Sequence, residues 1–209
     1  YNDSVQIKKE WNFAAMSGVE RIEGQTLGIA GLGKIGQAVA KRAQSFGMNV
    51  IAYDPYLPAA VAEKLNVKLT DIDDVLINSD VITIHMNLTN ENKAFFDLDK
   101  FKIMKKKPYI INVARGAIIN EEDLVKALDL GLIKGAGIDV LESEYPDMKT
   151  NKLVGRANVI LTPHSAYYSA ASDFLSAKIT AENVTHCLAG DFKGAARVVN
   201  GVGLALASQ

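Results

Sequence analysis

The stretch Thr26-Leu-Gly-Ile-Ala-Gly-Leu-Gly-Lys-Ile-Gly36 decides the fold class of this chain. Its first part, Thr26 to Ala30, is an apolar run typical of a buried strand. Gly31, Gly33 and Gly36 follow in the pattern GxGxxG. A strand that leads directly into such a turn is typical of the start of a βαβ unit, in which the turn binds the phosphates of a dinucleotide.

The residues beyond this turn complete the unit. A helical pattern extends from Lys34 to about Phe46, and a second apolar strand runs from Asn49 to Tyr53. It ends at Asp54, eighteen residues beyond Gly36, close to the spacing at which an acidic residue binds the ribose. A carboxylate there repels a 2′-phosphate, so the pattern favours NAD over NADP. Many glycine-rich turns match GxGxxG by chance, but the strands, the helix and the acid together predict dinucleotide binding.

Each residue of the turn has an expected physical role. Gly31 permits the tight turn, Gly33 lets the backbone approach a pyrophosphate, and Gly36 lets the helix and strand pack closely. The first helical residues offer unpaired N–H groups and the positive end of the helix dipole to the phosphates. The predicted cofactor contacts of this unit are therefore Gly31, Gly33, Lys34, Ile35, Gly36 and Asp54.

Composition excludes several classes of function. The 209 residues are 48% hydrophobic and 22% charged, as in ordinary globular proteins, and the net charge of −1 predicts no nucleic-acid or membrane partner. No apolar stretch is long enough to span a bilayer. Cys187 is the single cysteine, which rules out an intramolecular disulfide and favours a reducing, cytoplasmic location. The three histidines show no metal-ligand spacing, so we expect no metal site.

Strand-like and helix-like runs alternate along the whole chain. Beyond the first unit, we expect strands at 67–69, 81–84, 109–113, 135–140 and 159–161, and helices at 58–65, 72–78, 98–104, 121–130 and 169–189. Asn120 is a predicted N-cap and Gly131 a predicted helix end. The strands are continuously apolar, which is expected when both faces of a sheet are covered. The pattern therefore predicts an α/β fold with a doubly wound, mostly parallel sheet, of the Rossmann type.

Ligands of such a sheet bind beyond the carboxyl ends of the strands, where the reactive side chains of this chain gather. Arg115, Glu144 and His164 each follow a strand. The Arg115 fork suits a carboxylate with an adjacent carbonyl, and His164 can exchange a proton near neutral pH. A carboxylate on His164 would favour its charged form. With a nicotinamide as hydride acceptor, these groups suffice to interconvert 2-hydroxy and 2-oxo acids.

Several assignments at this edge have alternatives. Chemistry alone does not choose Glu144 over Glu142, and Arg115 could form an ordinary surface ion pair. His85 could simply end its strand. Asp139 ends an apolar strand and needs a partner, either the nicotinamide carboxamide or a neighbouring backbone N–H. With these alternatives open, the further predicted cofactor contacts at this edge are His85, Val113, Ala114, Asp139 and His164.

Four segments together resemble the D-isomer-specific 2-hydroxyacid dehydrogenases, over nearly the whole chain. They are Gly28–Gly36, Ile111–Gly116 with Glu121 downstream, Gly137–Glu144 and Leu161–Ser165. The resemblance implies that Arg115 binds substrate, that Glu144 rather than Glu142 assists, and that His164 is the acid–base. It also implies that Asp139 contacts the nicotinamide, that NAD is the cofactor, and that two copies pair through their cofactor domains as a homodimer.

The resemblance also implies that a substrate domain is largely missing. We expect residues 1–23 to connect from that domain, residues 24–190 to form the NAD-binding domain, and residues 191–209 to return toward it. Without the missing lobe the cleft cannot close over a substrate or exclude water. The fragment alone is therefore expected to bind NAD and to show little or no turnover.

Finer features point in two directions. Residues 53–57 and 167–169 are most similar to the branch containing phosphoglycerate dehydrogenases and C-terminal-binding-protein corepressors. Asn87, Asn90 and Asn92 depart from the family pattern in a loop that lies near substrate and cofactor in relatives.

The leading hypothesis is an NAD-dependent dehydrogenase of a small 2-hydroxy acid. A non-catalytic, NAD-sensing interaction protein is the alternative, because a sensor needs only the nucleotide site. A methyltransferase or hydrolase with a similar loop would leave Arg115 and His164 unexplained.

Overall fold

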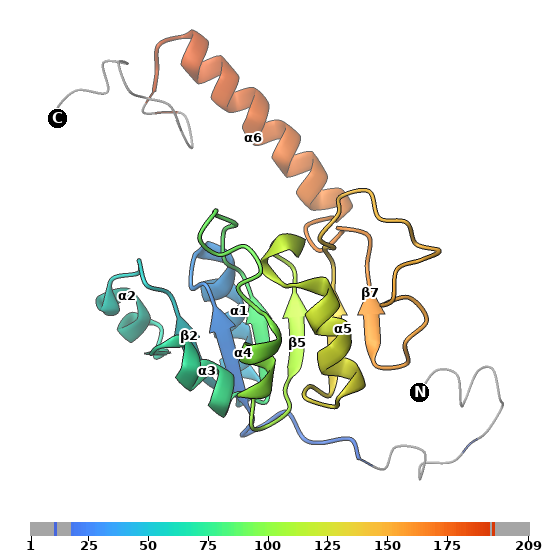
Figure 1. Cartoon of the computed structure of the whole chain (residues 1–209). Helices are drawn as coiled ribbons and strands as arrows, with labels where there is room; N and C mark the ends of the chain where they lie inside the picture. Colours follow the sequence, from blue (N-terminus) through green and yellow to red (C-terminus); the bar gives the residue numbers. More distant parts are fainter. Residues whose placement is uncertain (1–10, 12–17, 193, 195–209) are drawn as a thin grey trace. The chain divides into compact units, whose positions relative to one another are not determined.

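The computed structural model describes Trp11, residues 18–192 and Gly194 of the chain. The chain divides into two compact units, Tyr1–Pro163 and His164–Gln209. The first unit contains the glycine turn and the entire sheet (Figure 1). The second contains one long helix. The predicted connecting segments 1–23 and 191–209 lie mostly outside the described residues.

The sheet of the first unit has seven strands in the order β3-β2-β1-β4-β5-β6-β7, and every pairing is parallel. From β1, the third strand in this order, the chain continues through β2 to the edge strand β3. It then crosses to β4, on the other side of β1. This reversal makes a topological switch point between β1 and β4, where ligands of such sheets bind. The strands are β1 (Thr26–Ala30), β2 (Asn49–Tyr53), β3 (Lys68–Leu69), β4 (Val81–Ile84), β5 (Tyr109–Asn112), β6 (Gly135–Ile138) and β7 (Val159–Leu161). The predicted Rossmann-type α/β fold is confirmed.

Helices cover both faces of this sheet. The α-helices of the first unit are α1 (Lys34–Ser45), α2 (Ala59–Lys64), α3 (Ile72–Asn78), α4 (Leu98–Lys102) and α5 (Glu121–Asp129). Side chains of α1 and α2 pack with alternate residues of β1 and β2 in one core cluster. Side chains of α3, α4 and α5 pack in a second, larger cluster. The second unit contains α6 (Ala170–Leu188).

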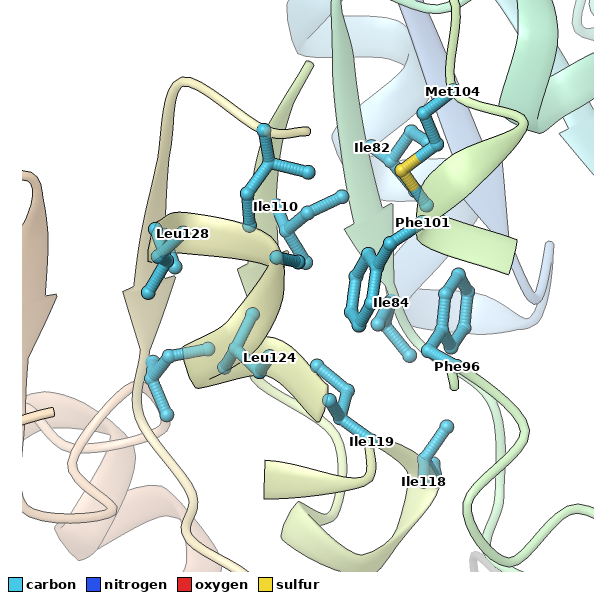
Figure 2. Close-up of a cluster of buried hydrophobic side chains, with 14 of the residues drawn as sticks. Ile82, Ile84, Phe96, Phe101, Met104, Ile110, Ile118, Ile119, Leu124 and Leu128 are labelled. Carbon is cyan, nitrogen blue, oxygen red and sulfur yellow. The ribbon is translucent and has the colours of Figure 1, made fainter. Parts of the chain in front are cut away.

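The larger cluster extends along β4 and β5 and includes Ile118 and Ile119, which lie beyond the carboxyl end of β5. Figure 2 shows Phe96 and Phe101 close to Ile84 of β4, with Leu124 and Leu128 of α5 in the same cluster. Phe96, Phe101 and Leu124 are almost completely buried. Burying a side chain of this size contributes roughly 1.5–3 kcal/mol. The cluster therefore gives the loops at this edge a rigid base.

Local capping sets several helix boundaries. Asn120 caps α5 by accepting the Asp123 N–H, as predicted, and Gly131 ends that region with a φ of +63°. Asp71 and Asp97 cap α3 and α4 in the same way. Ser169 caps α6 and forms a capping box with Ser172. These polar side chains satisfy N–H groups that the helices leave free.

Several predicted boundaries differ from the structure by one or two residues, and one element of the structure is not predicted. β5 ends at Asn112 rather than residue 113, and β6 ends at Ile138 rather than residue 140, where its partner strands also end. α4 ends at Lys102 rather than residue 104. The unpredicted element is a 3-10 helix, Gly116–Ile118, just beyond β5 (Figure 1). This helix is hydrogen-bonded to the loop between β4 and α4, because the Ala94 N–H donates to the Ala117 carbonyl oxygen at 2.8 Å.

Candidate functional site

Two glycines of the turn after β1 occupy positions that no other residue can take without strain. Gly31 has a φ of +95°, and a Cβ there would lie 2.8 Å from the His85 carbonyl carbon. A Cβ at Gly36 would collide with the Gly31 carbonyl oxygen. The expected roles of both residues, a tight turn and close packing of α1, agree with this geometry.

Gly33 differs, because open space lies above it. A Cβ at Gly33 would meet no heavy atom within 4 Å. Gly33 is also the N-cap of α1, so no side chain at this position occupies the free N–H groups of the first turn. The first turn of α1 contains no acidic residue, and Lys34 and Ile35 are exposed. Free N–H groups, a positive dipole end and open space together form an anion site. The residues present therefore fit the pyrophosphate of a dinucleotide.

Asp54 follows β2 and braces the glycine turn. Its Oδ2 accepts the Leu32 N–H at 2.9 Å, and its Oδ1 accepts the Tyr56 N–H at 3.1 Å. Each carboxylate oxygen retains a lone pair for a further donor, such as a ribose hydroxyl. The sequence predicts the ribose contact, but it does not reveal that the same carboxylate organises the turn.

The end of β5 presents Arg115 on a hydrogen-bonded turn. Asn112 is buried, its Nδ2 donates to the Arg115 carbonyl oxygen at 3.0 Å, and its Oδ1 accepts the Ala114 N–H at 3.1 Å. The Arg115 guanidinium is exposed, and its Nη1 donates to the Ala114 carbonyl oxygen at 2.6 Å. Val113 and Ala114 are half-buried. Asn112 is a positioning residue to which the sequence assigns no role, although its place directly before the turn is a signal.

His85 and Asp139 directly follow β4 and β6. The His85 Nε2 lies 3.0 Å from the Thr83 hydroxyl, and burial lowers the pKa of the imidazole below its usual value, which favours the neutral form. Asp139 is buried and accepts a hydrogen bond from the Thr162 hydroxyl at 2.5 Å. The Thr162 hydroxyl is thus a donor beside the two predicted candidates, the nicotinamide carboxamide and a neighbouring backbone N–H, which stay predictions. It comes from the residue after β7, next to β6 in the sheet.

The three predicted catalytic residues divide between the two units. Arg115 and Glu144 belong to the first unit, where they follow neighbouring strands, and both are exposed. Their segments meet at Gly116, where a Cβ would collide with the Leu141 carbonyl oxygen. His164 opens the second unit with a φ of +53°, a conformation that side chains rarely adopt. Its grouping with Arg115 and Glu144 stays a prediction.

Two further features of the described residues concern metals and membranes. No group of three or more His, Cys, Asp or Glu side chains in this part of the chain could bind a metal ion. No helix within the described ranges is both long enough and apolar enough to cross a membrane.

Comparisons with known proteins agree with this geometry. The NAD-binding domain of D-isomer specific 2-hydroxyacid dehydrogenases matches residues 1–166. D-3-phosphoglycerate dehydrogenase of Methanocaldococcus jannaschii is 42% identical over 192 residues, which are 91% of this chain and 36% of that protein. The chloroplastic D-3-phosphoglycerate dehydrogenase 2 of Arabidopsis thaliana is 39% identical over 188 residues, which are 90% of this chain and 30% of that one.

A solved structure has the same fold. The crystal structure of D-lactate dehydrogenase with NAD+ from Lactobacillus jensenii superposes with a TM-score of 0.83 at 28% identity, covering 95% of this chain and 62% of that one. This chain thus spans about a third of the length of the curated relatives. The family match covers the glycine turn, Asp54, the Arg115 turn and the Glu144 segment, and on this ground the chain belongs to the D-isomer specific 2-hydroxyacid dehydrogenases as their NAD-binding domain.

Proposed function

We propose that this chain is the NAD-binding part of an oxidoreductase that transfers a hydride between a small 2-hydroxy acid and nicotinamide, with 2-oxo acid reduction as the reverse reaction. The observation that carries the proposal is the carboxyl edge of the sheet. There the open turn at Gly33 and the Asp54 carboxylate lie at the ends of β1 and β2, and Asn112 holds the turn that presents Arg115.

Each reactive side chain has a defined part in this proposal. Arg115 binds the substrate carboxylate and polarises the adjacent carbonyl. His164 gives a proton to the substrate oxygen during reduction and accepts it during oxidation. Glu144 favours the charged form of His164. Bound NAD supplies the hydride acceptor, and Asp139, already bonded to Thr162, contacts its carboxamide.

The test uses the complete protein encoded by the gene and a panel of 2-oxo acids. NADH oxidation with at least one of them is expected, and His164→Gln should lower kcat while NAD affinity stays unchanged. Unchanged kcat would refute the role of His164. NAD binding without turnover of any 2-oxo acid would instead favour a non-catalytic NAD sensor, similar to the corepressor branch.

Further proposals concern the state of the protein. We propose that the 209-residue chain by itself binds NAD without appreciable turnover, because it spans only about a third of the length of its curated relatives. We also propose that the protein is a homodimer, because it resembles a family whose members pair through their cofactor domains. The single cysteine supports a cytoplasmic location. The net charge of −1 supports the absence of a nucleic-acid partner. Light scattering on the complete protein tests the dimer.

A further inference from the structure

Glu121, the first residue of α5, binds both ends of one loop. Its Oε2 accepts the backbone N–H of Glu142 at 3.1 Å, and its Oε1 accepts the side-chain Nδ2 of Asn151 at 2.7 Å. Glu142 and Asn151 enclose about half of the connection from β6 to β7, and Glu144 lies between them. One carboxylate therefore closes the base of the loop that carries Glu144.

The Asn151 end of this loop is itself anchored in the core. The Asn151 Oδ1 accepts the N–H of Leu153 at 2.8 Å, and Leu153 is 1% exposed within the larger hydrophobic cluster. The Asn151 amide is thus oriented, with its oxygen on the Leu153 N–H and its nitrogen on the Glu121 carboxylate. The carboxylate joins a fixed point on one side to the Glu142 peptide on the other.

The Glu142 end also contacts the turn that presents Arg115. A Cβ on Gly116 would lie 2.6 Å from the Glu142 nitrogen, so Gly116 packs against the peptide that donates to Glu121. Glu144 is two residues beyond this peptide. The position of the Glu144 backbone relative to the Arg115 turn therefore depends on a contact that Glu121 holds in place.

We propose that Glu121 is a positioning residue, which holds the Glu144 loop in register with the Arg115 turn during catalysis. This inference rests on the proposed function, in which Glu144 assists His164. Closing a loop at its base removes most of the alternative positions of the residues within it. A displacement of about 1 Å in a catalytic group can lower a rate by up to about 100-fold.

The role requires a carboxylate in particular. Two donors converge on this side chain, and a carboxylate supplies two acceptor oxygens. Glutamine has one oxygen and an NH₂ group, which would face a second donor and lose that bond. Glu122 offers a matched control, because it lies in the same first turn, has the same charge near the helix dipole and is exposed. Among the described residues, no hydrogen bond from the loop to Glu122 is found.

The experiment compares E121Q, E122Q, E144Q and the E121Q/E144Q double variant in the complete protein. E121Q is expected to lower kcat by about tenfold or more, with NAD affinity within about twofold of wild type, and E122Q to leave both unchanged. Because Glu121 acts through Glu144, the double variant should be no slower than E144Q. Hydrogen exchange at residues 142–151 should be faster in E121Q and unchanged in E122Q.

Several outcomes would overturn the inference. The first is a wild-type kcat in E121Q. The second is a double variant whose loss of kcat equals the product of the losses in E121Q and E144Q. The third is unchanged hydrogen exchange at residues 142–151 in E121Q. If E144Q is slow and E121Q is not, only this inference fails. If E144Q itself has wild-type kcat, the proposed role of Glu144 fails and this inference falls with it. Should E121Q not fold, N151D replaces it, because that variant keeps the acceptor for Leu153 and removes the donor to Glu121.

Discussion

Replacing Gly33 by alanine should separate nucleotide binding from folding. The Gly33 backbone has φ −70° and ψ −166°, which alanine adopts without strain, and its added methyl group would meet no heavy atom within 4 Å. The methyl group would instead occupy the space where the pyrophosphate approaches the N-terminus of α1. The variant should therefore fold normally and bind NADH poorly.

The expected magnitudes differ for the two properties. Alanine is a poorer N-cap than glycine by some tenths of a kcal/mol, and it restricts the unfolded chain by a similar amount, so the free energy of unfolding should change by less than about 1 kcal/mol. Displacing the phosphates weakens at least one hydrogen bond to a charged group, worth roughly 1.5–3 kcal/mol. NADH affinity should therefore fall by about 10- to 100-fold.

The assay is NADH fluorescence titration together with thermal unfolding, both on the 209-residue chain. Gly36→Ala is the contrasting control, because its Cβ would collide with the Gly31 carbonyl oxygen. That variant should lose stability as well as affinity. Wild-type NADH affinity in a folded Gly33→Ala protein would refute the assignment of the open space above α1 to the cofactor.

Two further predictions concern the stability of the fold that carries the site. Asn112→Ala should lower the free energy of unfolding by about 1–3 kcal/mol, because it leaves the Ala114 N–H without its partner and leaves the Arg115 carbonyl with only the N–H of Ile118; urea denaturation showing no change would contradict this. For Asp80, burial raises the pKa, but the Thr26 N–H and Lys106 lower it more, so the net pKa lies below the usual value. A depressed pKa stabilises the fold above the unfolded-state pKa of about 3.9 and loses that effect as pH falls through the folded value. Asp80→Asn should therefore be less stable than wild type at pH 7, with a deficit that shrinks below about pH 4; urea midpoints with a pH-independent difference would count against this.

Elements with a strong local signal could be predicted closely from the sequence. The bounds of β1, β2, β4, β7 and α3 agree with the apolar runs and capping residues that predict them. These signals are local, since the side chains of a strand or helix and its cap lie within a few residues. The βαβ unit with Asp54 is likewise predictable from the sequence, because its strands, glycines and acidic residue occur at a set spacing along the chain.

Boundaries that depend on neighbouring strands were less predictable. Asp139 and Val140, which follow Ile138, are still buried, but β6 stops pairing where β5 and β7 end. The 3-10 helix after β5 follows from the hydrogen bonds of Asn112 and from pairing with residues 94–96. No local pattern contains that information, because it depends on which strands lie side by side.

The sequence by itself determined the βαβ nucleotide unit and the order of strands and helices, and it placed the reactive side chains after strands. Only the tertiary structure decided their partners: Asp54 to the Leu32 N–H, Asp139 to Thr162, and Glu121 to both ends of the Glu144 loop. These pairs join residues that are more than twenty positions apart in the chain. They form only when the sheet fixes the order and register of its strands, because hydrogen bonds depend on distance and direction rather than on residue type alone.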